Sequence, residues 1–594
     1  MQFSQLAAYF GRIEKTSLRN EKTTILAELF KELTSEEVGQ VAYLSVGRLG
    51  PLYDPLEFGL AGKMVVRAVS WGTGKTGEEV TALYKIAGDL GEVVSGLKTA
   101  QSVDQSHAIS PSISEVFQEL TSVAKDGGKG SQERKIEKLG KLLKALGAES
   151  SKYVVRLIMG KLRLGFSDLT ILDSLSWSAT GGKADRGALE HAYNVWSDMG
   201  AVAQLYKTQG VEGLLATDVV PGRPVKPMRA ERLGTIREIV AKLVTFAVEP
   251  KYDGMRVQIH AYQQEEASAT KDMAQEGLFA EESNSVTVKI FSRGLEDITH
   301  MFPDVVASAR ALQSSAGDFV IDGEALGIDL STGTFLSFQE TIKRKRKHDV
   351  DTAANNIPLS IQLFDVLYGE GSGRLSETYS ARRTLLANLI QQSSEKIFHL
   401  AESTVVTTAE EAQKLFDLYM HDRLEGMLCK RLDSHYLAGA RNFNWVKYKR
   451  AHEEGLVDTI DCVVMGYYAG KGKRMQFGVG AFLVGVQGGG GQIVTVAKIG
   501  TGLTDVQFRE LYSRMQPIVS SGVDSRYVVA QSLAPDVWVS PSVVVEIQSD
   551  EITKSPIHSA GYALRFPRLV TFRDDKGLDD ITTVAEVEHL FGLI

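Results

Sequence analysis

The spacing of apolar residues changes twice along this 594-residue chain, which is too long for a single hydrophobic core. The first ~215 residues carry apolar residues at helical spacing, and strand signals are nearly absent apart from KMVVRAVSW (63–71). A proline-rich joint at 219–233 ends this region, and strands and helices then mix up to about Lys449. The last ~145 residues are rich in glycine and short strands, which suggests a small closed barrel. We therefore expect three domains, at 1–218, 219–449 and 450–594.

Basic residues gather in the helical part, although the chain has a net charge of −8. Between Lys125 and Arg163 stand eleven Lys/Arg and four Asp/Glu, a local excess of +7. A basic surface of this kind is typical of a polyanion-binding face, but a solvated helix face would give the same pattern.

Two segments of this basic stretch have the pattern of amphipathic helices. GGKGSQERKIEKLGKLLKAL (127–146) is expected to be a glycine turn, an N-cap at Ser131 and a helix, whose free N–H groups suit a phosphate. In SKYVVRLIMGKLRL (151–164) one face is apolar, and Lys152, Arg156 and Arg163 lie outside it. The apolar face is formed by Tyr153, Val154, Leu157, Ile158 and Leu162.

Several familiar classes can be set aside. GTGKT (72–76) is not a phosphate-binding loop, because Val69 stands where that motif requires glycine. No apolar run reaches the ~20 residues of a membrane span, and the N-terminus lacks the features of a secretion signal. With only Cys429 and Cys462, the sequence offers neither a disulfide framework nor a zinc site, which favours a cytoplasmic location. We expect Cys429 to fill the buried side of a strand.

One short stretch, VEPKYDGMR (248–256), places Lys251 at a strand–turn junction between two alternating segments. Taken alone, such a lysine is as easily an ordinary surface group. It is followed, however, by an ordered series of further motifs. These are FSRGLED (291–297), DGEAL (322–326), LFDVLY (363–368), EGMLCK (425–430), WVKYK (445–449) and LRFPRLVTFRDDK (564–576).

This ordered series resembles the motifs of the covalent nucleotidyltransferases, which include ligases and capping enzymes. More specifically, it is similar to the ATP-dependent DNA ligases of the archaeal and eukaryotic replicative type, over essentially the whole chain. The resemblance implies an all-α DNA-binding domain, an α+β nucleotidyltransferase (adenylation) domain and a C-terminal β-barrel with the OB-fold.

The resemblance also implies a role for each motif residue around ATP. Lys251 would attack the α-phosphate and become a lysyl-AMP, since a lysine amine is a nucleophile once its pKa is lowered. Glu249 would accept a hydrogen bond from adenine; a plain surface carboxylate is the alternative. Phe364 would stack on the base, and Arg256 and Arg293 would hold ribose or phosphate.

Carboxylates and further cations complete the implied site. Glu324 would hold the ribose or help bind Mg²⁺, and Glu425 is the second candidate ligand for that metal. Lys447 and Lys449 alternate along one strand and share a face, with Lys447 on the α-phosphate. Arg441 would be a further nucleotide-binding arginine.

The last motif would act from the barrel. Arg568, Arg573 and Lys576 are expected to orient pyrophosphate during adenylylation only, with hinge residues near Arg450. Three steps are implied: lysine adenylylation, AMP transfer to a 5′-phosphate, and attack by a 3′-hydroxyl with release of AMP. The expected substrate is nicked double-stranded DNA, sealed by a monomer during replication, repair and recombination.

Some features remain open at this stage. MQFSQLAAYF (1–10) faintly resembles a sliding-clamp-binding peptide, but Phe3 replaces the expected glutamine and an amphipathic helix is favoured. KRKRK (343–347) either touches or steers DNA, or is a solvated loop. The acidic loop 263–284 and Arg229, where an apolar residue is usual, depart from the family pattern. An RNA ligase or capping enzyme, and a non-catalytic DNA-binding scaffold, are the rival functions.

Overall fold

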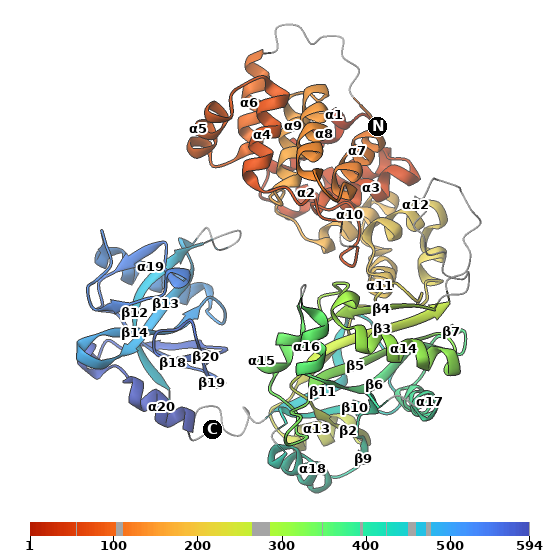
Figure 1. Ribbon diagram of the computed structural model, residues 1–594, viewed down its shortest axis with the longest axis vertical. Helices are drawn as coiled ribbons and strands as arrows, with labels where there is room; N and C mark the ends of the chain where they lie inside the picture. The colour runs from red at the N-terminus through yellow and green to blue at the C-terminus, as the bar shows by residue number, and fades with distance from the viewer. Residues whose placement is uncertain are drawn as a thin grey trace. The chain divides into compact units, whose positions relative to one another are not determined.

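The computed structural model divides the chain into two compact units, Met1–Lys447 and Tyr448–Ile594 (Figure 1). The structure describes residues 1–54, 56–101, 111–263, 286–346, 349–392, 396–422, 424–449, 459–470, 474 and 477–592. The expected acidic loop, apart from Gln263, and the expected hinge at Arg450 lie outside this range. No helix among the described residues is long and apolar enough to cross a bilayer.

The first part of unit one is helical, as predicted, and its helices share one hydrophobic core. Several helices begin at a Ser or Thr N-cap followed three residues later by Glu, for example Thr34 with Glu37 and Ser112 with Glu115. The helices are α1 (Phe3–Glu14), α2 (Arg19–Glu32), α3 (Ser35–Ser45), α4 (Gly62–Thr73), α5 (Gly77–Ala87), α6 (Leu90–Gln101), α7 (Ile113–Lys125), α8 (Ser131–Ala145), α9 (Ala148–Ile158), α10 (Asp168–Thr180), α11 (Arg186–Trp196) and α12 (Met199–Leu215).

Two local expectations in this region are wrong. The segment 63–71, expected as a strand because of its valines, lies in α4, where Val65, Ala68 and Val69 are buried at helical spacing. Packing of that face against the helical core overrides the β preference of valine. Ser131 is the first residue of α8 and not its N-cap, which is Gly130 at a φ of 79°. GTGKT (72–76) covers the last two residues of α4 and the turn that leads to α5.

The expectation that Lys152 and Arg156 lie outside the packed face of their helix is also wrong. The Arg156 side chain is 3% exposed and pairs with Asp89 (2.8 Å), Glu14 (2.9 Å) and Glu92 (2.8 Å). Lys152 pairs with the same two glutamates. Because α9 is packed on nearly all sides, its charged side chains are buried as well, and a buried charge requires partners. Arg163 remains half exposed, next to Asp89.

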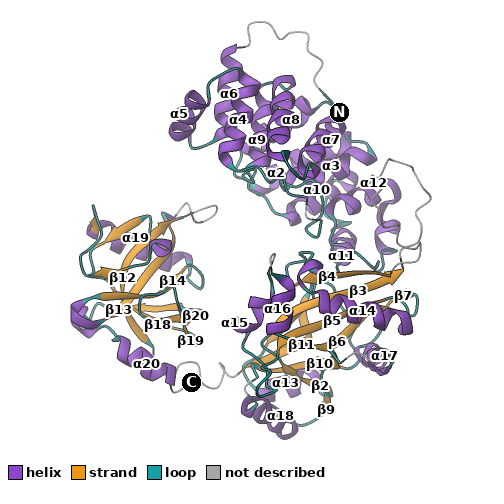
Figure 2. Cartoon of the chain, in the orientation of Figure 1, coloured by secondary structure: helices purple, strands orange, loops and turns teal. Residues whose placement is uncertain are grey.

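The second part of unit one carries two sheets (Figure 2). The six-stranded sheet has the order β4-β3-β5-β6-β7 with β8 on β6, and the five-stranded sheet has the order β1-β11-β10-β2-β9. Their strands are β1 (Arg229–Arg232), β2 (Phe246–Lys251), β3 (Met255–Gln263), β4 (Val286–Ser292), β5 (Phe319–Gly327), β6 (Leu359–Gly369), β7 (Ser372–Gly373), β8 (Phe398–Leu400), β9 (Thr404–Val406), β10 (Gly426–Arg431) and β11 (Arg441–Lys449). The helices are α13 (Ile236–Leu243), α14 (Pro303–Ala316), α15 (Phe338–Thr341), α16 (Val350–Asn356), α17 (Tyr379–Gln391) and α18 (Ala409–His421).

Alternation along β3 separates a structural face from a polar face. Val257 and Ile259 point into a core shared with α14 and α17, which cover one side of the six-stranded sheet. Arg256, Gln258 and His260, one position out of phase, share the opposite face. The polar face of this sheet therefore holds the residues that can contact a ligand.

Unit two is rich in strands, as predicted. Its main sheet has the order β15-β17-β12-β13-β14-β16, and β18 pairs with β12 and β21. The elements are β12 (Ile460–Ala469), β13 (Val479–Gln487), β14 (Ile493–Ile499), α19 (Asp505–Met515), β15 (Val519–Ser520), β16 (Tyr527–Val528), β17 (Val537–Val539), β18 (Val544–Gln548), β19 (Glu551–Lys554), β20 (Tyr562–Arg565), β21 (Arg568–Phe572) and α20 (Val584–Gly592). Two cores, one around Val484 and one around Met465, lie on its two sides.

Candidate active site

Lys251 is the last residue of β2 and lies directly opposite Gly426, the first residue of β10. The backbone N–H of Glu425 donates to the Lys251 carbonyl at 3.0 Å, and the Lys251 amine forms an ion pair with the Glu425 carboxylate. Burial, together with nearby Arg293, lowers the pKa of Lys251, while Glu324 and Asp253 oppose that shift. A lower pKa raises the fraction of free amine, which is the nucleophilic form.

Glu324 is the second carboxylate near this amine. It lies on β5 opposite Arg256, and burial raises its pKa to about 7 although Lys251, Arg256 and Arg293 act in the other direction. Among the described residues no cluster of three or more His, Cys, Asp or Glu could hold a metal. Mg²⁺ at a nucleotide site commonly takes only one or two carboxylates, with phosphate and water completing its shell. The pair Glu324 and Glu425 therefore fits that ion.

Glu249 is buried at 2% exposure, so its interpretation as a surface carboxylate is wrong. It accepts a hydrogen bond from the Tyr379 hydroxyl and pairs with Lys430 at 2.7 Å. Lys430 is fully buried, and its Nζ lies 4.9 Å from the ring centroid of Phe364 and 4.5 Å from that of Trp445. Lys430 and Tyr379 were missed in the sequence, although EGMLCK (425–430) contains Lys430 on the strand that pairs with Glu249.

Phe364 lies on β6, between Lys430 and Arg256. The Arg256 Cζ atom is 5.3 Å from the Phe364 ring centroid, and the Phe364 and Trp445 rings meet edge to face. Arg256 donates to the buried carboxylate of Asp322 and, at 3.1 Å, to the hydroxyl of Tyr436. An aromatic face and a fixed guanidinium are therefore adjacent.

Cations gather where β11 runs beside β1. Lys447 on β11 lies opposite Arg232, and burial lowers its pKa, helped by the neighbouring charges of Lys251, Arg441, Arg232 and Arg293. Like charges in one place favour an anion between them. Arg232 was missed in the sequence, since nothing in its own segment marks it.

Lys449 and Arg229 lie on the same pair of strands, β11 and β1. Lys449 shares the half-buried face of Lys447, as alternation predicted. Arg229 is exposed and donates to the Gly439 carbonyl at 2.8 Å, so an apolar residue is not needed there.

The three cations predicted in the last motif form ion pairs within unit two. Arg573 and Lys576 both contact Asp461, at 3.3 and 2.5 Å, and Arg568 contacts Asp550 at 3.0 Å. Asp461 therefore holds two of the three predicted cations side by side.

Within KRKRK (343–347) the described residues are already engaged. Arg344 is fully buried and pairs with Asp304, so it is neither a DNA contact nor part of a solvated loop. Lys343 and Lys345 pair with Glu340 and Glu296. Cys429 is buried in its strand, as expected.

The chain matches three family descriptions in order along its length. They are "DNA ligase N terminus" at residues 2–176, "ATP dependent DNA ligase domain" at 280–449 and "ATP dependent DNA ligase C terminal region" at 475–576. Lys251 falls between the first two matched ranges, on the N-terminal side of the acidic segment 263–284.

Full-length relatives and a solved structure are also similar. A protein named "Probable DNA ligase" from Dictyoglomus turgidum is 40% identical, covering 100% of this chain and 97% of the relative. A "DNA ligase" from Pyrobaculum islandicum is 38% identical, with 100% and 98% covered. The solved structure named Pmar-Lig_PreS3 shares the fold, with a TM-score of 0.56 at 17% identity and 96% and 99% covered.

Proposed function

Because this chain belongs to the ATP-dependent DNA ligase family, we propose that Lys251 is the residue on which it carries AMP while it joins DNA strands. The enzyme is an ATP-dependent DNA ligase, so the RNA-ligase, capping-enzyme and non-catalytic alternatives are wrong. The observation that carries the assignment of Lys251 is its half-buried amine, whose pKa is lowered. This amine pairs with Glu425 and interacts electrostatically with Glu324.

In the first step the Lys251 amine, having lost a proton, attacks the α-phosphorus of ATP. A P–N bond forms, the bond to the β-phosphate breaks, and pyrophosphate leaves. Burial among Arg293 and Lys447 supports this role, because it lowers the pKa of Lys251 and the same cations attract the triphosphate.

The base would lie against Phe364, with its exocyclic amine donating to Glu249. Glu249 is held in place by Lys430 and Tyr379, which favours a fixed acceptor at that position. Arg256 and Glu324 would hold the ribose.

The phosphates would meet the cations of the β1–β11 edge together with Arg293, which follows β4. Arg293, Arg441, Lys447 and Lys449 provide guanidinium and ammonium donors, and Lys447 would contact the α-phosphate. Glu324 and Glu425 would hold Mg²⁺, which when bound would neutralise charge on phosphate oxygens.

Unit two would be an OB-fold barrel that contributes Arg568, Arg573 and Lys576 to the leaving pyrophosphate. A barrel that meets the nucleotide in one step must leave before DNA enters, so we propose a hinge at about Arg450. We further propose the domain boundaries 218/219 and 449/450, with the proline-rich joint as the first.

The second and third steps take place on nicked DNA. AMP moves from Lys251 to the 5′-phosphate, and the 3′-hydroxyl then displaces it. We propose that the helical region binds DNA phosphates without reading sequence and that the enzyme acts as a monomer in the cytoplasm, during replication, repair and recombination. No clamp contact is assigned to residues 1–10, because Leu6 and Phe10 are buried in the helical core.

Separate single-turnover assays test this scheme. Glu425→Gln and Lys447→Met should slow adenylylation from ATP at least about 100-fold, while a surface control, Glu340→Gln, should not. Unchanged adenylylation in both site variants would remove the proposed nucleotide site.

A further inference from the structure

The segment that joins the helical region to the sheets, residues 219–228, is bound to the polar face of the six-stranded sheet. Three of its backbone N–H groups donate to side chains: Gly222 to His260 (3.1 Å), Val225 to Gln258 (2.8 Å) and Met228 to Tyr436 (3.1 Å). We call residues 219–228 the linker.

The amide of Gln258 uses all of its hydrogen-bonding capacity. Its Oε1 accepts from Val225 N–H and from His260 Nε2–H at 3.1 Å. Burial lowers the pKa of His260 to about 3, so the ring is neutral, and because Nδ1 accepts from Gly222 N–H the ring proton lies on Nε2. Its Nε2 donates to the Val225 carbonyl (3.2 Å) and to Asp322 Oδ1 (3.1 Å). An amide bonded on every side has one orientation.

The hydroxyl of Tyr436 is equally committed. It accepts from Met228 N–H and from Arg256 Nη2, each at 3.1 Å, and donates to Asp322 at 3.2 Å. Two of the three side chains that hold the linker, Gln258 and Tyr436, therefore also bind Asp322, the carboxylate that holds Arg256. Among the described residues, both hydrogen bonds of the Arg256 guanidinium use Nη2.

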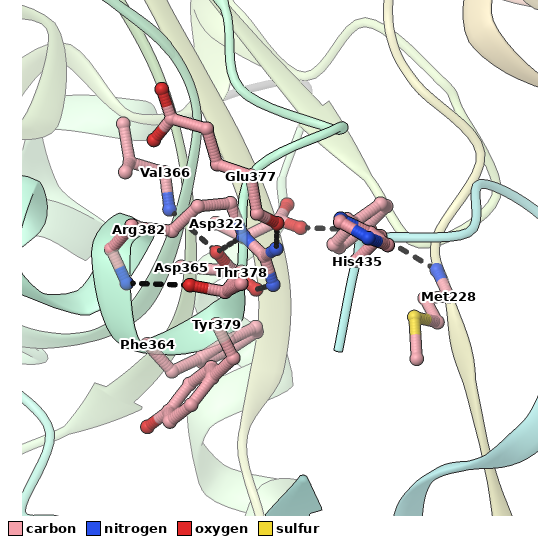
Figure 3. A network of polar contacts seen from close by, with 12 residues as sticks. Met228, Asp322, Phe364, Asp365, Val366, Glu377, Thr378, Tyr379, Arg382 and His435 are labelled. Atoms are coloured by element: carbon pink, nitrogen blue, oxygen red, sulfur yellow. Dashed lines mark hydrogen bonds and ion pairs between the residues drawn. The ribbon is translucent and has the colours of Figure 1, made fainter. Parts of the chain in front are cut away.

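A second buried ion pair, Arg382 with Asp365, lies beside the ring of Tyr436. Arg382 donates to both oxygens of Asp365, at 2.7 and 3.1 Å, and its Cζ lies 5.7 Å from the Tyr436 ring centroid. Figure 3 shows Arg382 directed at Asp365, with Asp322 in the same group and the backbone nitrogen of Met228 bonded at its edge. The network is buried, and its mutually paired groups hold one another in place.

At its other side the linker contacts helix α11 of the helical region. Lys226 Nζ lies 3.3 Å from the ring centroid of Tyr193, and Arg223 Cζ lies 4.8 Å from that of Trp196. Lys226 N–H also donates to the Asn194 carbonyl at 2.8 Å. Within six residues, 223–228, the linker thus contacts both helix α11 and the side chains of Gln258 and Tyr436.

We propose that Gln258 and Tyr436 are positioning residues for Arg256, and that through them the nucleotide site is coupled to the linker and to helix α11. The inference rests on the proposed contact of Arg256 with the nucleotide. Coupling of this kind is reciprocal: if the linker fixes Arg256, then nucleotide bound to Arg256 stabilises the linker.

Kinetics of adenylylation test the positioning role. Tyr436→Phe and Gln258→Met should each raise KM for ATP at least about tenfold, with a smaller change in kcat, because a hydrogen bond to a charged group is lost. Tyr206→Phe, which removes a hydroxyl bonded to Asp185 in the helical region, is the control and should change neither. Adding Tyr436→Phe to Arg256→Met should raise KM no further, whereas a merely structural role would give additive effects.

Hydrogen exchange on the full chain tests the coupling. Adenylylation should slow exchange of the Val225 and Met228 amides in the parent enzyme, and this slowing should be lost in Tyr436→Phe and Gln258→Met. Lys226→Met, which touches no residue of the nucleotide site, should still raise KM for ATP about threefold. The proposal is overturned if adenylylation leaves the exchange rates of these amides in the parent unchanged, or if the double variant shows additive effects on KM for ATP. An unchanged KM in Arg256→Met alone would instead remove the proposed role of Arg256.

Discussion

The carboxylate of Glu425 and the amine of Lys251 form an ion pair across the β2–β10 pairing, although the two residues stand 174 positions apart in the chain. The antiparallel register of β2 and β10 creates this contact, since it places the residue before Gly426 beside the end of β2. The geometry of the strand pair, and not local sequence, therefore brings Lys251, the proposed nucleophile, to its acidic partner.

The pH dependence of adenylylation should show the raised pKa of Glu324. The carboxyl is protonated below about pH 7 and ionised above it, so kcat/KM for ATP in the first step should rise through about pH 7. Glu324→Gln should lower kcat/KM and remove that inflection, leaving the one that belongs to the amine. An inflection near pH 7 that persists in Glu324→Gln would assign it to another group.

Truncating Arg156 should destabilise the helical region strongly. Arg156→Met takes one of its cations from the buried Asp89, which then faces Arg163, and removing one partner of a buried pair costs about 3 to 5 kcal/mol. Arg12→Met, which breaks an exposed pair with Glu28, should cost less than about 1 kcal/mol. The free energy of unfolding of the two variants, measured with denaturant, tests this prediction. Equal losses of that free energy would contradict this account.

Lys576→Ala should separate the steps of the reaction. If this cation orients pyrophosphate, its loss should slow adenylylation by an amount equivalent to about 2 to 4 kcal/mol and leave sealing of pre-adenylated nicks nearly unchanged. Arg526→Ala, which breaks an exposed ion pair with Asp524 in the same unit, is the control. Equal slowing of both steps would show that Lys576 supports unit two through Asp461 or contacts DNA.

Strands around the proposed nucleotide site could be predicted from sequence because short runs of strand-forming residues end at turn residues, as β2 does before Asp253 and Gly254. The motif residues on those strands were identified differently, from the resemblance of the ordered motif series to the ligase family. The burial of Arg156 could not be predicted from the sequence, because its partners Glu14, Asp89 and Glu92 stand 64 to 142 positions away. Helix α4 was mistaken for a strand, since valine favours strands and only the packing of this segment in the helical core makes it a helix.

The covalent adduct itself provides the most direct measurement. The parent enzyme, Lys251→Ala and a surface control, Lys141→Ala, are incubated with α-labelled ATP, denatured and examined for acid-labile label on the protein. Label on the parent and on Lys141→Ala, with none on Lys251→Ala and with sealing of pre-adenylated nicks retained by Lys251→Ala, is the predicted result. Acid-labile label on Lys251→Ala would contradict the assignment of the nucleophile.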